Sequence, residues 1–316
     1  MGDSHPGLRY RADLQGLRAL AIALVVLAHA GLPGLAGGFV GVDVFFVLSG
    51  YLISGLLLRE RIATGHIRFL DFIARRLRRL LPALLTMLVT TTGLGLVLLS
   101  GHEFSEQTAS VAYAATWTSN LYFALTTFDY FAELHLRDLF LHTWSLGVEE
   151  QFYLVWPLLT WLAVGLAERP HAQSVSSPQR ASRRRRLLMS TAAVFAASLA
   201  LSLYWSATNG LWAFYLTPSR VWQFALGAAV CIWFEVDRDA ADPVHVRSPA
   251  AWYGVQWGGI AVIAGSAVLL SPAVVYPVAV GVVAQRGCGD GDCRRLRRAG
   301  KPGRRYPGPC AGRLAG

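Results

Sequence analysis

The 316-residue sequence is poor in charge and in cysteine. Asp, Glu, Lys and Arg make up 15% of the residues, against about 25% in an average soluble domain. The four cysteines include no CxxC pair, and no other metal-ligand spacing is present, so we expect no metal site. Because 54% of the residues are hydrophobic, the composition indicates an integral membrane protein whose first partner is the lipid bilayer.

The net charge of +10 is concentrated in segments between apolar runs. In a soluble protein such an excess would suggest nucleic acid. Basic segments beside membrane spans more often set topology, so we expect no nucleic-acid partner.

About 20 mainly apolar residues are needed to cross a bilayer. A weaker run, Val111 to Leu125, contains several polar and aromatic residues, and we expect it to be re-entrant, interfacial or one arm of a pair with Phe128 to Leu141. The stronger candidate spans are Leu17 to Leu35, Phe39 to Leu58, Leu80 to Ser100, Trp144 to Leu166, Leu187 to Ala207, Val221 to Val236 and Trp252 to Leu270. The predicted fold is an all-α, polytopic transmembrane bundle.

Arginine-rich segments orient this bundle. Arg9, Arg11 and Arg18 flank the first span, and further arginines crowd the loops 59–79 and 168–186. The positive-inside rule places all three segments, and the N-terminus, in the cytoplasm. The first span lacks a small-residue cleavage site and is therefore predicted to be retained.

Two other segments have a distinct character. Phe69 to Leu81 alternates apolar residues with arginines, which predicts an amphipathic interfacial helix ending at Pro82. After Ala284 the apolar pattern stops, and 285–316 is rich in Arg and Gly and holds three of the four cysteines. We expect this tail to be a disordered, out-of-frame continuation, with a natural basic tail as the alternative.

The segment from His142 to Tyr153, HTWSLGVEEQFY, is the strongest candidate for chemistry. It places two carboxylates, Glu149 and Glu150, at the mouth of a predicted span. Ionisable groups at such positions cost several kcal/mol and usually have a function. Tyr153 lies one turn after Glu149 and should share its helical face.

A histidine and an aspartate complete the candidate set. His29 lies about 16 Å along one helix from Arg18. It is either a base at the outer membrane face or a structural core histidine. Asp43 needs a polar partner, for which His29 is the predicted choice because an Asp–His pair fixes the imidazole tautomer. The glycines around Asp43 are expected to serve helix packing.

Four motifs resemble the acyltransferase 3 family, which comprises membrane-bound bacterial O-acyltransferases of surface polysaccharides and related acceptors. They are Arg18-x10-His29, GFVGVDVFFVLSGY ending at Tyr51, RRLRRLLP ending at Pro82 and the His142 segment. The block Phe214 to Gly227 resembles a later family segment, in which Gln223 replaces a common Glu. The likeness covers roughly 8–284, with about eight of ten expected spans.

The resemblance implies an acyl-CoA donor, usually acetyl-CoA, a carbohydrate hydroxyl as acceptor, and the bacterial inner membrane as location. His29, Asp43 and Glu149 would be catalytic. Trp144, Ser145, Glu150 and Tyr153 would contact the acceptor, although Ser145 is preferred as a helix cap and Trp144 as part of the interfacial aromatic belt. The donor phosphates would be held by Arg18, Arg75, Arg76, Arg78 and Arg79.

Two alternatives stay open. The chain is either a transporter or flippase of acyl or lipid-linked carriers, without chemistry, or a non-catalytic remnant of a longer acyltransferase. A purely structural scaffold is disfavoured, because it gives no reason for Arg18, His29, Asp43 and Glu149 to occur together.

Overall fold

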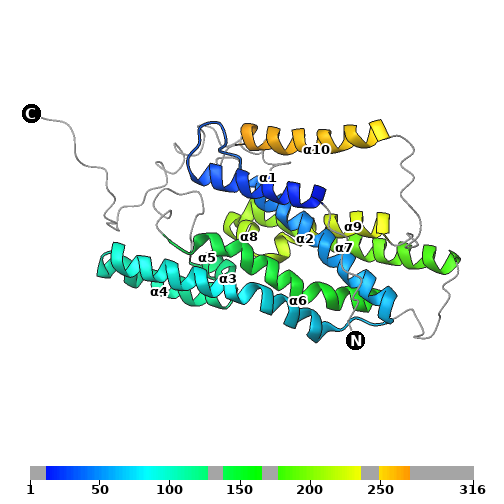
Figure 1. The fold of residues 1–316 in the computed structure, drawn as a ribbon, viewed down its shortest axis with the longest axis horizontal. Coiled ribbons are helices and arrows are strands. Elements are labelled where there is room, and N and C mark those ends of the chain that lie inside the picture. Colours follow the sequence, from blue (N-terminus) through cyan, green and yellow to red (C-terminus); the bar gives the residue numbers. More distant parts are fainter. Residues whose placement is uncertain (1–11, 127–137, 166–176, 236–248, 271–316) are drawn as a thin grey trace, which may run out of the picture.

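The computed structural model describes residues 12–126, 138–165, 177–235 and 249–270. Within these ranges the chain contains ten α-helices and two short 3-10 helices and no strand, which confirms the all-α prediction (Figure 1). The elements are α1 (Ala12–His29), α2 (Val40–Thr64), α3 (Phe69–Leu98), α4 (Gly101–Ala115), α5 (Ser119–Leu125), η2 (Leu141–Thr143), α6 (Trp144–Gly165), α7 (Ser177–Thr208), α8 (Gly210–Tyr215), η3 (Thr217–Ser219), α9 (Val221–Glu235) and α10 (Pro249–Leu269).

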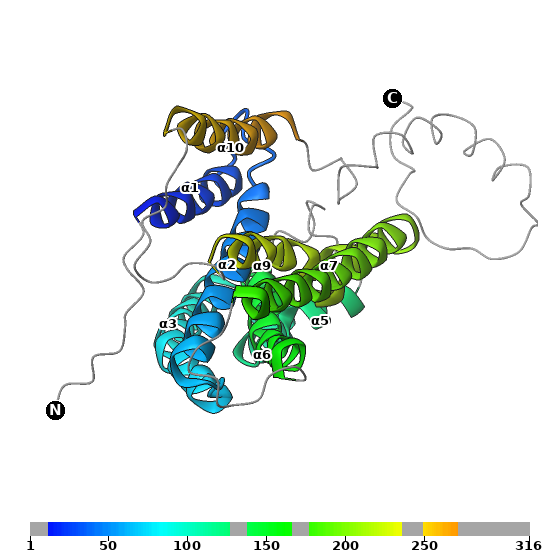
Figure 2. The ribbon, with the colours of Figure 1, turned by 90° about the vertical axis from the view of Figure 1, so that its right-hand side faces the viewer.

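In the described part of the chain, four helices are long and apolar enough to cross a membrane, namely α1, α2, α3 and α7. The two glutamates of α6 lower its hydropathy, and α9 has only 15 residues. Around α2, α1 lies on one side with α10 beyond it, and α9 and α7 lie on the other (Figure 2). The predicted bundle is therefore confirmed as a set of helices, while the predicted tail 285–316 lies outside the described residues.

The predicted interfacial helix ending at Pro82 is wrong. Helix α3 runs without a break from Phe69 to Leu98, with Pro82 inside it. A proline removes one backbone hydrogen bond but is tolerated in helices of membrane proteins, where neighbouring groups satisfy the released carbonyl. The arginines of this segment therefore belong to the first turns of a long helix.

The weak run Val111 to Leu125 is divided between α4 and α5. A turn separates the two helices at Trp117, whose φ of 55° is left-handed. A capping box between Ser100 and Glu103 starts α4, as such boxes satisfy the first backbone N–H groups of a helix. As predicted, the run therefore does not cross the bundle as one helix. Its expected partner segment, Phe128 to Leu141, begins outside the described residues.

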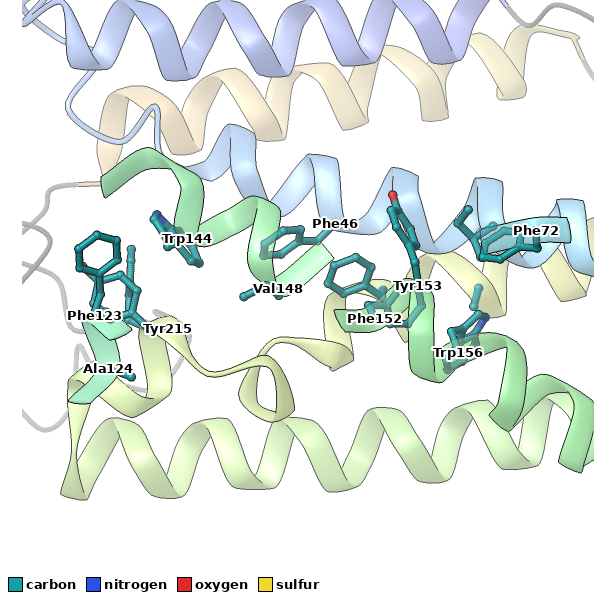
Figure 3. Packing of buried hydrophobic residues seen from close by; sticks show 14 of the residues in the cluster. Phe46, Phe72, Phe123, Ala124, Trp144, Val148, Phe152, Tyr153, Trp156 and Tyr215 are labelled. Atoms are coloured by element: carbon teal, nitrogen blue, oxygen red, sulfur yellow. The ribbon is translucent and has the colours of Figure 1, made fainter. Parts of the chain in front are cut away.

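The packing centre of the bundle is the crossing of α2 and α9. A β-carbon on Gly50 would overlap the Phe224 carbonyl, and one on Gly227 would overlap the Val47 carbonyl. Small residues permit this close backbone approach, which drives helix association in membranes. Phe224 then stacks on a phenylalanine from α2 at 4.6 Å and on Phe152 from α6 at 4.1 Å between ring centroids. Helix α6 is thereby held against α2 (Figure 3).

Candidate active site

A polar cluster lies inside the apolar contact between α2, α3 and α6. The hydroxyls of Ser49 and Tyr153 both donate to Oε1 of Glu149. Tyr153 is 3% exposed, and its hydroxyl points toward α2 (Figure 3). The predicted shared face of Glu149 and Tyr153 is confirmed, and Ser49 is a member of the cluster that sequence reasoning missed.

Arg76 enters the same cluster from α3. Its guanidinium carbon lies 3.6 Å from the centroid of the Tyr153 ring, which is cation–π geometry. It also interacts electrostatically with Glu150. Within this cluster, Arg76 Nε and Glu150 Oε1 are two buried atoms that have no hydrogen-bond partner among the described residues. Buried polar atoms usually have partners, so these two atoms are the groups that an entering polar molecule could satisfy.

The other three arginines of this segment behave differently from Arg76. Arg75, Arg78 and Arg79 are exposed. Arg75 pairs with Glu60 at 3.5 Å, and Arg78 Nε donates to the carbonyl of Ala74 at 3.2 Å. Exposed arginines at the start of α3 remain accessible to an anion, whereas Arg76 is directed into the bundle.

A hydrogen-bond network fixes the start of α6 beside this cluster. Gln151 Nε2 donates to Asn120 Oδ1 at 2.9 Å and to the Trp117 carbonyl at 3.2 Å. The Thr217 hydroxyl donates to Gln151 Oε1. Because Asn120 is fully buried, this network joins α5, α6 and η3 rigidly. It holds the turn that carries the two glutamates.

A second ionic group surrounds Asp43 on α2. Asp43 Oδ1 lies 3.6 Å from Arg220 and accepts a hydrogen bond of 2.9 Å from Gln223 Nε2. Arg220 is 1% exposed, and its Nε donates to the Phe214 carbonyl at 2.7 Å. Its guanidinium carbon also lies 5.5 Å from the Trp144 ring centroid. Sequence reasoning missed Arg220, although a lone arginine in the apolar block Phe214 to Gly227 was a visible signal.

His29 is exposed at the last residue of α1. Its Nδ1 lies 2.8 Å from the Val25 carbonyl, and because a carbonyl only accepts, Nδ1 must carry the proton. Nε2 of the neutral ring is then unprotonated and could accept a proton. The predicted pairing of His29 with Asp43 stays a prediction.

His142 lies near His29. Although His142 is exposed, the protein atoms around its ring lower its pKa, and repulsion from a protonated His29 lowers the pKa further. Two histidines therefore lie close enough to interact electrostatically, at the end of the bundle that was predicted to face outward.

The remaining predicted residues occupy varied positions. Trp144 is 3% exposed and packs 4.6 Å from the Phe214 ring, so it is a core residue rather than part of an interfacial belt. Ser145 lies inside the first turn of α6 and donates to the His142 carbonyl at 3.3 Å, which is not a capping bond to a backbone N–H. Arg18 is half-buried on α1. The described residues contain no group of three or more His, Cys, Asp or Glu that could hold a metal ion.

Comparison with known proteins gives independent evidence about the family of this chain. A family model described as "Acyltransferase domain" matches residues 11–284. BcsY of Komagataeibacter xylinus, provisionally named a membrane-bound transacylase, is 38% identical over 248 residues, covering 77% of this chain and 57% of that protein. The O-acetyltransferase OatA of Staphylococcus aureus is 42% identical over 152 residues, covering 48% of this chain and 25% of OatA. The chain thus spans little more than half the length of the first of these relatives and a quarter of the second. No solved structure matches the chain significantly.

Proposed function

Because the chain belongs to the acyltransferase 3 family, we propose that it is a membrane O-acyltransferase that moves an acyl group from acyl-CoA to a carbohydrate hydroxyl. Acetyl is the expected acyl group, since OatA, which shares 42% identity over the matched region, is named an O-acetyltransferase. The proposed location is the bacterial inner membrane, with the N-terminus in the cytoplasm.

The observation that carries this proposal is the cluster of Ser49, Glu149 and Tyr153 with Arg76 inside an apolar bundle. A bundle with a purely structural role gains little from two carboxylates and an arginine at this depth, because burying charge is costly. A site that handles a polar substrate and moves protons requires such groups.

The reaction can be assigned to residues step by step. Nε2 of His29 accepts the proton of the acceptor hydroxyl, and the resulting oxygen attacks the thioester carbonyl of the donor. The new ester C–O bond forms, the C–S bond breaks, and the proton held by His29 passes to the departing CoA thiolate, which restores the base. The three exposed arginines of α3, Arg75, Arg78 and Arg79, bind the donor phosphates, since a guanidinium group can donate two parallel hydrogen bonds to one phosphate.

The cluster on α6 positions the reactants in this scheme. Glu149 orients the acceptor through a carboxylate that is itself held by Ser49 and Tyr153. Glu150 and Arg76 offer their unpartnered polar atoms to the substrate. Asp43 keeps its place through Arg220 and Gln223.

The test compares the unchanged chain with His29→Gln in bacterial membranes supplied with radiolabelled acetyl-CoA. We expect ester-linked label in the envelope carbohydrate to fall by about 10²–10⁴-fold in the variant, while binding of acetyl-CoA to the purified protein persists. Label that crosses the membrane without forming an ester would favour a transporter instead. An equal ester yield from His29→Gln would refute the assignment of His29 as the base.

A further inference from the structure

A hollow of about 390 Å³ lies between α7 and α9, away from the polar cluster described above. One wall is a single face of α7, and the other is Trp233 of α9. The α7 wall comprises residues at helical spacings of three and four: Ala181, Arg184, Arg185, Leu188, Met189 and Ala192. This volume lies within the range of small-molecule sites, about 300–1,000 Å³, but the hollow is shallow and largely open on its outer side.

The α7 wall changes character along the helix. After Ala181 it presents Arg184 and Arg185, and it then becomes apolar through Leu188 and Met189. Arg185 and the last lining residue, Ala192, are seven positions apart, or about 10 Å along the axis. The hollow therefore has a cationic end and an apolar end. A glycerophospholipid has the same order, with an anionic headgroup followed by an acyl chain.

Exposure of the apolar end points to lipid. Met189 is 60% exposed and Trp233 is 58% exposed, on two helices of a bundle whose outer surface faces hydrocarbon. The Arg184 guanidinium carbon lies 5.3 Å from the Trp233 ring centroid, so an arginine of the cationic end contacts the aromatic wall. Tryptophan and arginine together are typical of the membrane–water interface.

Charge complementarity selects the lipid class. The basic run Arg183 to Arg186 starts the span of α7, on the side predicted to be cytoplasmic, and the cytoplasmic leaflet carries anionic headgroups. We infer that this hollow is a binding site for one anionic phospholipid of the inner leaflet, with its phosphate at Arg184 and Arg185 and an acyl chain along Met189 and Trp233. This site does not depend on the proposed acyl transfer.

The test measures phosphatidylglycerol binding to the purified full chain by native mass spectrometry, with phosphatidylcholine for comparison. We expect a preference for phosphatidylglycerol in the unchanged chain. In the Arg184→Gln/Arg185→Gln variant we expect binding on the order of tenfold weaker. Met189→Trp, which fills the apolar end without changing charge, should also weaken binding.

A matched control removes the same amount of charge elsewhere. The Arg59→Gln/Arg186→Gln variant also loses two arginines from the predicted cytoplasmic side, but neither lines the hollow. We expect its phosphatidylglycerol affinity to stay within about twofold of the unchanged chain, since a defined site depends on its own contacts. An equal loss in the control would overturn the site in favour of diffuse attraction. Displacement of the lipid by acetyl-CoA would overturn it in favour of a donor site.

Discussion

The guanidinium of Arg76 lies over the ring of Tyr153, 3.6 Å from its centroid. Tyr153 in turn donates to Glu149. An arginine from the segment predicted to hold the donor is therefore in contact with the residues predicted to serve the acceptor. This contact connects the two halves of the proposed reaction through two side chains.

The first prediction concerns Arg76→Lys. The lysine keeps the charge but loses the planar contact with the Tyr153 ring. We expect kcat to fall by about tenfold, comparable to the loss of one desolvated cation–π contact, with little change in the KM for acetyl-CoA. Arg79→Lys is the comparison, and there we expect the donor KM to rise instead. Should Arg76→Lys raise the donor KM and leave kcat intact, Arg76 would be a phosphate ligand.

The second prediction concerns the two hydroxyls that bind Glu149. Tyr153→Phe and Ser49→Ala each remove one donor to the carboxylate, and hydrogen bonds to a charged group contribute about 1.5–3 kcal/mol. We expect each variant to lose about tenfold or more in kcat, since each 1.4 kcal/mol is a factor of about ten. In the double variant the two losses should not add, because both hydroxyls act on the same oxygen.

A structural control for these variants lies one turn further along α6. Trp156 Nε1 donates to the Ser54 hydroxyl at 2.8 Å, so Trp156→Phe also removes a buried contact between α6 and α2. We expect it to lower the melting temperature while leaving kcat within about twofold, as an interaction that is the same in ground and transition state does. If Trp156→Phe and Tyr153→Phe reduce kcat equally, the Glu149 cluster has only a structural role.

The third prediction is a pH dependence of stability. Surrounding protein and His29 lower the pKa of His142 in the folded chain, so the unfolded chain binds this proton more readily. Above the unfolded pKa of about 6.5, His142 is neutral in both states and does not change the free energy of unfolding. As the pH drops below that value toward the lowered folded pKa, the unfolded chain binds the proton first and stability falls. We expect His142→Gln to flatten the melting temperature between pH 7 and pH 5, measured in detergent. An unchanged slope would exclude His142 as the titrating group.

The sequence predicted the helical class and the packing role of the glycines because both follow from local composition. Long apolar runs must form helices in a bilayer, and the glycines around Asp43, Gly50 among them, permit close backbone contact between helices. The matching role of Gly227 was not predicted. The shared face of Glu149 and Tyr153 was also predictable, because spacing fixes it within one helix.

Contacts between helices could not be predicted in the same way. Arg76 and Arg79 lie in one basic motif, and only the packing of α3 against α6 directs Arg76 inward. Asp43 pairs with Arg220, far away in sequence. A contact with Asp43 also accounts for Gln223 at a position where the family commonly has Glu. The Gln223 amide donates a hydrogen bond to Asp43, whereas an ionised glutamate has no proton to donate. Pro82 does not terminate α3, because one lost hydrogen bond does not end a long apolar helix.

The last prediction tests the crossing of α2 and α9, on which the geometry of the site depends. In Gly50→Ala the new methyl group would overlap the Phe224 carbonyl, and backbone cannot yield as a flexible side chain can. We expect a loss of about 1–3 kcal/mol or more in stability, with a shift of Phe224 that also moves Phe152 and the start of α6. Gly93→Ala in α3 is the matched control, because its β-carbon would meet nothing within 4 Å. At that position alanine should stabilise the helix by about 0.5–1 kcal/mol, because it loses less backbone freedom on folding than glycine does. Opposite signs for these two substitutions, measured by thermal unfolding in the same detergent, would separate close helix packing from helix propensity, whereas a neutral Gly50→Ala would contradict the backbone contact between α2 and α9.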